Sequence, residues 1–460
     1  MGNFFSSLSS VAAGMRVYER ALNTIQNNVS NASTPGYVRQ RLTMVALPFS
    51  QEGAQTGGLA AGPILSARDE YAERSVRNQQ EGYGYHSQLA TDLARIEPVF
   101  TVAENAGIPG ALSKFFQSFS VLSVSPNDPA NRQVVIDRAQ DVATAFNQTA
   151  IALVNASQNA NRQIDSVIDR INSIAGTIQE INLERRQNFR DRGDAGLDAR
   201  LHVALEELSE LVNYSALPQE DGSITVLIGG QTPLVIGDRL YELHADVSGT
   251  SEAQILNPDG KNITDQLTSG RLGALLEFRN TVIPSLVDDV NRFAASVAGN
   301  VNTVLSQGVD ASGQPPALDL FSLDAAAGAA LTLRVDPAYS GDDIAASLPP
   351  PAPPGGNGNL LELAALPNSK QFAELDNFTF AEFYGKLAGH VGRSLSNARE
   401  NQNTQSLLLT QARALRSEVS SVSLDEEAVT LIQLQRGYQA SAQMVRTLDE
   451  LTETVIGMMR

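Results

Sequence analysis

Residues 4–29 read FFSSLSSVAAGMRVYERALNTIQNNV, and their apolar side chains recur at alternating spacings of four and three residues. This period predicts a helix with a coiled-coil seam along one side. The seam residues are Phe4, Leu8, Val11, Met15, Tyr18, Leu22, Ile25 and Val29. Few contacts usually hold the termini of a globular domain. A terminal helix with such a seam must therefore bury it against another part of the protein or against another molecule.

The other end of the chain repeats this pattern. Its seam consists of Leu431, Leu434, Tyr438, Val445, Leu448, Val455 and Met459, and it is widened by Ile432, Met444, Leu451 and Met458. One partner helix would not cover a stripe of this width. We expect the two terminal helices to pair and to contact neighbouring subunits, because burial of the remaining apolar surface favours other copies. The alternative is an ordinary core without partner subunits.

Long helices are predicted between the two ends. Asp128 followed by Pro129 is a strong helix start, and the apolar stripe after it persists to about Arg186. A helix of that length spans roughly 80–90 Å and indicates a rod. We also predict a strand over 37–45, followed by a loop at Gly53, Gly57 and Gly58. Further helices are predicted over 67–100, 111–122, 197–212, 271–305 and 380–419, with kinks at Gly82, Gly84 and Pro284. A capping box at 423–426 starts the last helix.

The period changes to two after Leu217. Ile224, Val226 and Ile228 alternate with other residues, and glycine-containing turns follow. These signals predict a small antiparallel β insertion over 217–268. Residues 308–376 are irregular and rich in Pro and Gly, with a possible strand at 331–335 and an extended stretch at 349–356. The predicted fold is mainly α, with paired terminal coiled-coil helices, a long-helix rod domain and a β-rich outer domain. The domains are 1–45 with 420–460 (terminal assembly), 46–216 with 269–307 and 377–419 (rod), 217–268 (β insertion) and 308–376 (irregular).

Composition excludes several function classes. The 460 residues carry a net charge of −18, which argues against generic binding to nucleic acid or to an anionic membrane. The chain has no Cys, so disulfides, thiolate metal sites and a Cys nucleophile are excluded. No stretch approaches the ~18 consecutive apolar residues of a membrane span. The N-terminus lacks the pattern of a cleaved secretory signal, because no basic residue precedes Arg16.

No catalytic, cofactor-binding or metal-binding constellation stands out from the sequence. The four histidines, His86, His202, His244 and His390, are far apart, so no helical metal pair exists. Arg192-Gly193-Asp194 could act as an adhesion tripeptide, but it reads more simply as a turn between helices. We therefore expect no enzymatic activity and no cofactor.

The two ends resemble those of bacterial flagellar rod, hook and hook-associated proteins. The N-terminal motif includes Asn27, Asn28, Asn31, Gly36, Tyr37, Arg39 and Gln40, and the C-terminal motif includes Leu424, Asp425, Glu426 and Glu427. Val38-Arg39-Gln40 and the β segment after Asp221 are similar to the hook-associated branch. The hook protein itself has a mostly β interior, whereas this chain predicts a very long helix. The middle of this chain is short for the branch, and 308–376 shows no clear second β domain.

The resemblance implies a secreted structural protein that joins hook to filament as a polymerised ring. Its implied partners are other copies of itself, the hook protein, the next hook-associated protein and the filament, and a cytoplasmic export chaperone on the C-terminal helix. Export would use the flagellar type III apparatus, and the turn ending at Tyr37 would fix the angle between the first helix and the strand. The alternatives are a hook or rod axial protein, a rod-like protein with peptidoglycan hydrolase activity, and a secreted coiled-coil adhesin or effector.

Overall fold

The computed structural model describes residues 2–49, 56–101, 106–187, 194–248, 252–310, 312–349, 356–370 and 372–458. The chain forms two compact units. Unit 1 contains residues 1–84, 170–243 and 405–460, and unit 2 contains residues 85–169 and 244–404. Three long helices contribute residues to both units: α2 (Glu70–Ile96), α4 (Pro129–Gln187) and α10 (Phe380–Ser420). The observed α4 and α10 confirm the long helices predicted from Asp128 and from Phe380.

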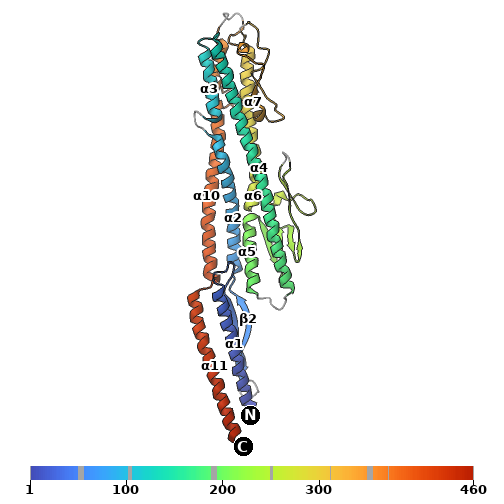
Figure 1. The fold of residues 1–460 in the computed structure, drawn as a ribbon, viewed down its shortest axis with the longest axis vertical. Helices are drawn as coiled ribbons and strands as arrows, with labels where there is room; N and C mark the ends of the chain where they lie inside the picture. The colour runs from blue at the N-terminus through green and yellow to red at the C-terminus, as the bar shows by residue number, and fades with distance from the viewer. Residues whose placement is uncertain are drawn as a thin grey trace. The chain divides into compact units, whose positions relative to one another are not determined.

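The two ends of the chain come together in unit 1. Helix α1 (Gly2–Ser30) packs against α11 (Leu424–Met458), and the hairpin of β1 (Gln40–Phe49) and β2 (Thr56–Ser66) packs against α1. Figure 1 shows the two helices side by side with both chain ends at the same end of the pair. The expected pairing of the terminal helices is therefore present within one chain.

Strand β2 was not predicted, because its glycines read as a loop. It pairs antiparallel with β1 from Gln40↔Ser66 to Phe49↔Thr56, with an irregularity between Leu42 and Met44. Gly58 has a φ of 129°, and a side chain there would collide with Ser10 of α1. The Ser10 hydroxyl donates to the carbonyl oxygen of Gly57 at 2.9 Å. Glycine is needed here because the strand backbone approaches the helix closely.

The remainder of unit 1 is a layer of helices with one sheet. Ile171, Ile174, Ile178 and Ile181 of α4 are buried, and α5 (Ala195–Leu211) belongs to the same unit. Helix α2 continues through Gly82 and Gly84, where kinks were expected. A side chain at Gly84 would lie 2.2 Å from the carbonyl oxygen of Glu210, so this glycine allows close packing.

The predicted β insertion proves to be two separate sheets. Strands β3 (Tyr214–Pro218), β4 (Ile224–Ile228), β5 (Thr232–Ile236) and β6 (Arg239–Leu240) form one antiparallel sheet in chain order. Asn182 of α4 holds this sheet, because its amide bonds both the N–H and the carbonyl of Ile224. Strands β7 (His244–Asp246) and β8 (Gln254–Leu256) pair with each other in a second sheet and belong to unit 2. Turn signals located the strands but did not determine which strands pair.

Unit 2 is a helical bundle around a continuous apolar core. Its other elements include η1 (Glu97–Phe100), α3 (Gly107–Leu122), η2 (Thr264–Gln266), α6 (Gly270–Glu277), η3 (Phe278–Val282) and α7 (Ile283–Gln307). The ring of Phe293 packs edge-on against Phe146 and also contacts Phe383. The kink predicted at Pro284 corresponds to a π-helical turn at η3, because Pro has no N–H for the usual bond to the residue four positions earlier.

Residues 308–376 add short elements to this core. They comprise β9 (Phe321–Ser322), α8 (Ala329–Thr332), β10 (Arg334–Val335), η4 (Gly341–Asp343), α9 (Gly358–Ala365), η5 (Leu366–Asn368) and η6 (Ala373–Leu375). The strand predicted over 331–335 forms only at Arg334–Val335, because Leu331 and Thr332 belong to α8, whose Ala329 and Ala330 are buried. Residues 350–355 of the predicted Pro-rich stretch lie outside the described residues. The segment is irregular, as expected, but Leu320, Ile344 and Leu360 are buried in the core.

The fold class is confirmed: the chain is mainly α with small antiparallel sheets. In the part of the chain that the structure describes, no helix has the length and apolar character needed to span a membrane.

Candidate subunit-assembly surface

The predicted seams face each other across α1 and α11. Ile25 is buried, and Val29 is 45% exposed. The other seam residues of the two helices are half-buried: Leu8, Val11, Met15, Tyr18, Leu22, Leu431, Leu434, Tyr438, Val445, Leu448 and Val455. Met459 and the side chain of Phe4 lie outside the described residues. Gly437 lies directly against the ring of Tyr18, where a side chain would be 2.8 Å from a ring carbon. The seam is thus largely used within the chain.

Beside the seam, α11 carries an apolar surface that nothing in the described chain covers. Glu427 is the only buried residue of the described α11. We call Ile432, Met444, Leu451 and Met458 the α11 flank; they are 50%, 58%, 47% and 81% exposed. At 100° per residue, Met444, Leu451 and Met458 follow one side of the helix, whereas Ile432 lies roughly 100° away from them. An exposed apolar row of this kind is typical of a protein–protein contact. The width of the C-terminal stripe therefore does exceed what one partner helix covers.

The two helices run antiparallel, and two contacts set their register. Asn28 bonds Glu427, and Tyr18 lies against Gly437. Moving ten residues back along α1 thus corresponds to moving ten residues forward along α11. The start of α11 lies beside the end of α1, at the turn into the first strand.

Asn28 is the centre of a buried polar cluster at this turn. Its side-chain amide nitrogen donates to the carbonyl oxygen of Gln40 at 2.9 Å and to Glu427 Oε2 at 3.1 Å. Its amide oxygen accepts from the backbone N–H of Gln40 and from the Tyr37 hydroxyl, each at 2.9 Å. Asn28 is 1% exposed, and all four bonding positions of its amide are used. This residue joins α1, the turn and α11.

Arg39 completes the cluster with two carboxylates. Its Nε donates to Glu427 Oε1 and its Nη1 donates to Glu426 Oε2, both at 2.6 Å. The Glu427 side chain is only 2% exposed, so its charge requires this pairing. Burial, and next the negative charge of Glu427, raise the pKa of Tyr37 above its ordinary value of 10. We call Asn28, Tyr37, Arg39 and Glu427 the corner cluster.

The capping box predicted at 423–426 forms only in part. The Ser423 hydroxyl accepts from the N–H of Glu426 at 3.4 Å. The Glu426 carboxylate, which was expected to turn back to Ser423, instead binds Arg39. A charged partner from a distant part of the chain outcompetes the local N–H for this carboxylate.

The remaining residues of the family motif have local roles or lie at the surface. Asn31 donates to the carbonyl oxygen of Asn27 at 3.0 Å and accepts from Thr34, which shapes the turn. Gly36 has a φ of 71°, and a side chain there would lie 2.6 Å from the carbonyl oxygen of Ala199. Leu424 and Asp425 are exposed. The structure brings Asn28, Tyr37, Arg39, Gln40, Glu426 and Glu427 together, and it leaves Leu424 and Asp425 outside this cluster.

A second buried charge cluster was not predicted from the sequence. Glu73 of α2 is 2% exposed and pairs with Arg68 and with Arg416. Arg68 also donates to Asp198 at 2.8 Å and to the carbonyl oxygen of Gly36 at 2.7 Å. Arg68 is only five residues from Glu73, but the other partners are far apart in sequence, so no local spacing could have indicated the whole cluster. The cluster ties the turn at Gly36 to α2, α5 and α10.

His202 lies in this second cluster as a neutral side chain. Burial, followed by the positive charges of Arg68 and Arg77, lowers its pKa to about 3, although Asp198 acts in the opposite direction. The guanidinium of Arg77 can only donate, so His202 Nδ1 accepts from it at 3.4 Å. The carboxylates of Glu73 and Asp198, 4.0 and 3.8 Å away, therefore face an uncharged ring.

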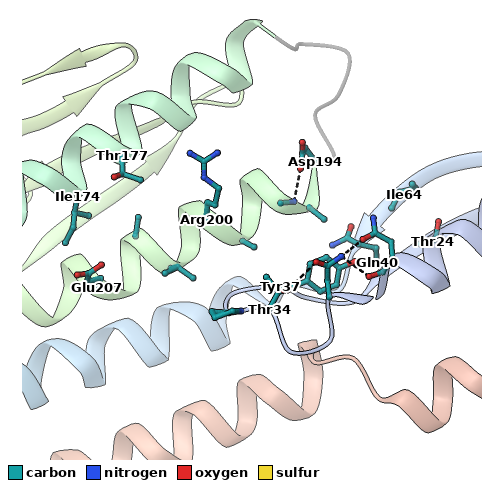
Figure 2. Close-up of a pocket in the computed structure, with 18 of the residues that line it drawn as sticks. Thr24, Thr34, Tyr37, Gln40, Ile64, Ile174, Thr177, Asp194, Arg200 and Glu207 are labelled. Carbon is teal, nitrogen blue, oxygen red and sulfur yellow. Dashed lines mark hydrogen bonds between the residues drawn. The ribbon is translucent and has the colours of Figure 1, made fainter. Parts of the chain in front are cut away.

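A groove of about 1320 Å³ borders the turn. Its walls come from the second half of α1, the turn at 34–37, β2, α4 and α5, all in unit 1. We call it the α5 groove. Figure 2 shows Thr24, Tyr37 and Gln40 on one side of it, with Ile174, Thr177, Arg200 and Glu207 on the other. Its lining mixes apolar and charged side chains, which suits the binding of a peptide segment. Among the described residues, no group of three His, Asp or Glu side chains is placed to hold a metal ion.

We expect Asn28→Ala to loosen the junction of α1 with α11. It would leave the Tyr37 hydroxyl, the Gln40 backbone and Glu427 with unmet hydrogen bonds, which costs about 1–3 kcal/mol. Urea unfolding of the full chain and hydrogen exchange of the α11 amides measure this loss. Asn23→Ala, at an exposed position of the same helix, is the control. Equal effects of the two substitutions would contradict a special role for Asn28.

His202 should make the protein less stable in mild acid. Above about pH 6.5 the ring is neutral in both folded and unfolded chains. Between pH 6.5 and about 3 only the unfolded chain takes up the proton, so stability falls as the pH falls. The loss attributable to His202 at pH 5 is on the order of 2 kcal/mol. Urea unfolding at pH 7.5 and pH 5 should show a smaller decrease for His202→Asn, and an unchanged decrease would refute this assignment.

Comparisons with known proteins agree with this architecture. The family model described as "Flagellar hook-associated protein FlgK helical domain" matches residues 93–321. A second, described as "Flagellar basal body rod FlgEFG protein C-terminal", matches residues 414–458, which include all of the described α11. The solved flagellar hook junction protein FlgK from Burkholderia pseudomallei superposes with a TM-score of 0.66 and covers 76% of this chain and 100% of its own. At 17% identity, this match shows a shared fold.

Similarity to curated proteins extends along the whole chain. Flagellar hook-associated protein 1 of Bacillus subtilis is 26% identical over 503 aligned residues, which cover 99% of this chain and 98% of the relative. The protein of the same name from Salmonella typhimurium is 23% identical over 552 aligned residues, covering 98% and 99%. These alignments exceed 460 positions, so the relatives carry segments without a counterpart here. From end to end, this chain is similar to flagellar hook-associated protein 1, and residues 93–321 match the helical domain of that protein.

Proposed function

We propose that this chain is a structural component of the bacterial flagellum that joins hook to filament as a polymerised junction ring. The observation that carries the proposal is the α11 flank, an apolar surface that remains exposed after α1 has covered the seam. The apolar surface that the α1–α11 pair leaves exposed within one chain can be buried by further copies of the chain. Relatives that match over the whole length bear the name flagellar hook-associated protein 1.

The partners follow from the same surface. Association with hook and filament components is implied by the family. We further propose that the chain forms a ring or helical homo-oligomer, and that it contacts the hook protein on one side and the next hook-associated protein on the other. A cytoplasmic chaperone would cover the α11 flank before export, since Met458 and Met444 are too exposed to remain uncovered at high concentration.

The proposed role requires association rather than catalysis. The polar clusters at the turn consist of fully paired charges and amides, which suits them to hold helices in place. We propose export through the flagellar type III apparatus with the N-terminal segment retained, because α1 is the surface against which α11 packs. A chain without Cys is also suited to export in an unfolded state, since it cannot be trapped by wrong disulfides.

Deletion of the gene tests the role directly. We expect electron microscopy to show hooks without filaments, with filament subunits lost to the medium. Reintroducing the full-length chain should restore filaments. Intact filaments in the deletion strain would refute the junction role, and loss of the hook as well would favour a rod or hook protein.

A charge in the seam should abolish assembly. Leu22→Asp or Leu448→Asp places a carboxylate between α1 and α11. Burial of an unpaired charge costs on the order of several kcal/mol. We expect export to continue and filament growth to fail, as scored by electron microscopy of complemented cells. Gln435→Asp, at an exposed position of α11, is the matched control and should support filaments. Normal filament growth with Leu448→Asp would contradict the assembly role of the seam.

A further inference from the structure

The α5 groove is lined by polar, charged and apolar side chains. Ile64 of β2 and Val203 of α5 line it, and each is 39% exposed. Arg20, Arg170 and Arg200 also line it. Two of these are already paired, Arg170 with Glu207 and Arg200 with Glu184. Among the described residues no carboxylate pairs with Arg20. Asp194 and Glu207 line the groove as well, so its three arginines leave a small positive balance in a chain with a net charge of −18. This balance favours a segment that is both apolar and acidic.

The last three turns of α11 have this composition. Leu451 and Met458 of the α11 flank are seven residues apart and therefore lie on one side of the helix. Asp449, Glu450 and Glu453 add three carboxylates, and residues 447–458 contain no Lys or Arg. At 100° per residue, Glu450 borders the flank on the side away from the seam. The segment thus offers an apolar stripe with a negative edge.

The size of the groove also fits a helical segment. A helix about 10 Å across and ten residues long, or about 15 Å, occupies roughly 1,200 Å³. The groove measures about 1320 Å³. The volume of the groove is therefore large enough to accept two to three helical turns.

The end of α11 cannot reach the groove of its own chain. The register set by Asn28 with Glu427 and by Tyr18 with Gly437 places Leu451 beside about residue 4 of α1. Arg20, the nearest part of α1 in the groove, is sixteen residues further along, which is about 24 Å at 1.5 Å per residue. Any occupant with this sequence must come from another molecule.

We infer that the α5 groove of one copy receives the final turns of α11 from a second copy, with Leu451 against Val203 and Glu450 close to Arg20. The inference rests on the proposed function and specifies the contact between subunits. Two different surfaces of the same chain meet in it, so the interaction is heterologous. Such contacts generate rings or open helices rather than closed pairs. They therefore suit a protein that polymerises on a tubular structure.

Cysteine cross-linking in assembled flagella tests this contact. Because the chain has no Cys, Val203→Cys in one tagged copy and Leu451→Cys in a differently tagged copy introduce the only thiols. The two are co-expressed in a strain lacking the native gene, and isolated hook–filament preparations are treated with a short bis-maleimide. We expect a cross-linked species carrying both tags. Ile236→Cys, 40% exposed on β5 and outside the groove, replaces Val203→Cys as the matched control and should give none.

Each outcome bears on the contact separately from the function. Filaments that form normally without a Val203–Leu451 cross-link would overturn the inference and leave the junction role intact. A cross-link from Val203 to a protein of different mass would overturn it as well, by assigning the groove to another partner. Failure of the unmodified chain to restore filaments in the deletion strain would instead overturn the proposed function.

A charge exchange gives an independent readout. Arg20→Glu and Glu450→Arg should each reduce the yield of the cross-linked species, and the double variant should recover it. Recovery is the result that a merely structural effect of either residue would not produce. Equal losses in the single and double variants would contradict the pairing of Glu450 with Arg20.

Discussion

The buried carboxylate of Glu427 is the constraint on which the pairing of the chain ends depends. Its charge is almost fully removed from water. The ion pair with Arg39 and the hydrogen bond from Asn28 offset the free-energy cost of burying it. Loss of one partner of such a buried pair typically costs about 3–5 kcal/mol. Because these partners lie at the end of α1 and the start of β1, satisfying Glu427 fixes three elements at once. The apolar seam supplies most of the attraction between the helices, and the corner cluster determines where they meet.

Different parts of α11 therefore make different kinds of contact. Its first turn is held by charge and hydrogen bonds, its seam is half-covered by α1, and its flank is exposed. The helix is thus well placed by its own chain but incompletely buried by it. The second charge cluster, around Glu73 and Arg68, anchors the turn at Gly36 to α2 and α5. The surface that we propose for assembly is therefore positioned by contacts within unit 1.

Local sequence signals predicted the long helices well, because capping residues and apolar periods are short-range features. Asp128-Pro129 marked the start of α4, and α10 was placed within one residue. These local signals failed where the structure depends on contacts between residues that are far apart in sequence. The glycines of β2 indicated a loop, whereas in the structure they allow α1 to pack closely against the strand. The sequence of 217–268 did not show that β6 and β7 belong to different sheets. Glu426 matched a capping box, yet Arg39, almost four hundred residues away, binds its carboxylate. The family motif identified the turn, but the sequence did not show that Asn28 and Glu427 touch.

The antiparallel seam has a consequence for the uniformity of the proposed polymer. A heptad pattern looks nearly the same after a shift of seven residues, so apolar packing alone would tolerate several offsets, each about 10 Å apart. The hydrogen bond of Asn28 to Glu427 exists at only one of them. It therefore acts as a length standard: every subunit presents the tip of α11 at the same distance from its turn. Without such a standard, subunits with equally stable helix pairs would differ in reach, and a ring built from them could not close evenly.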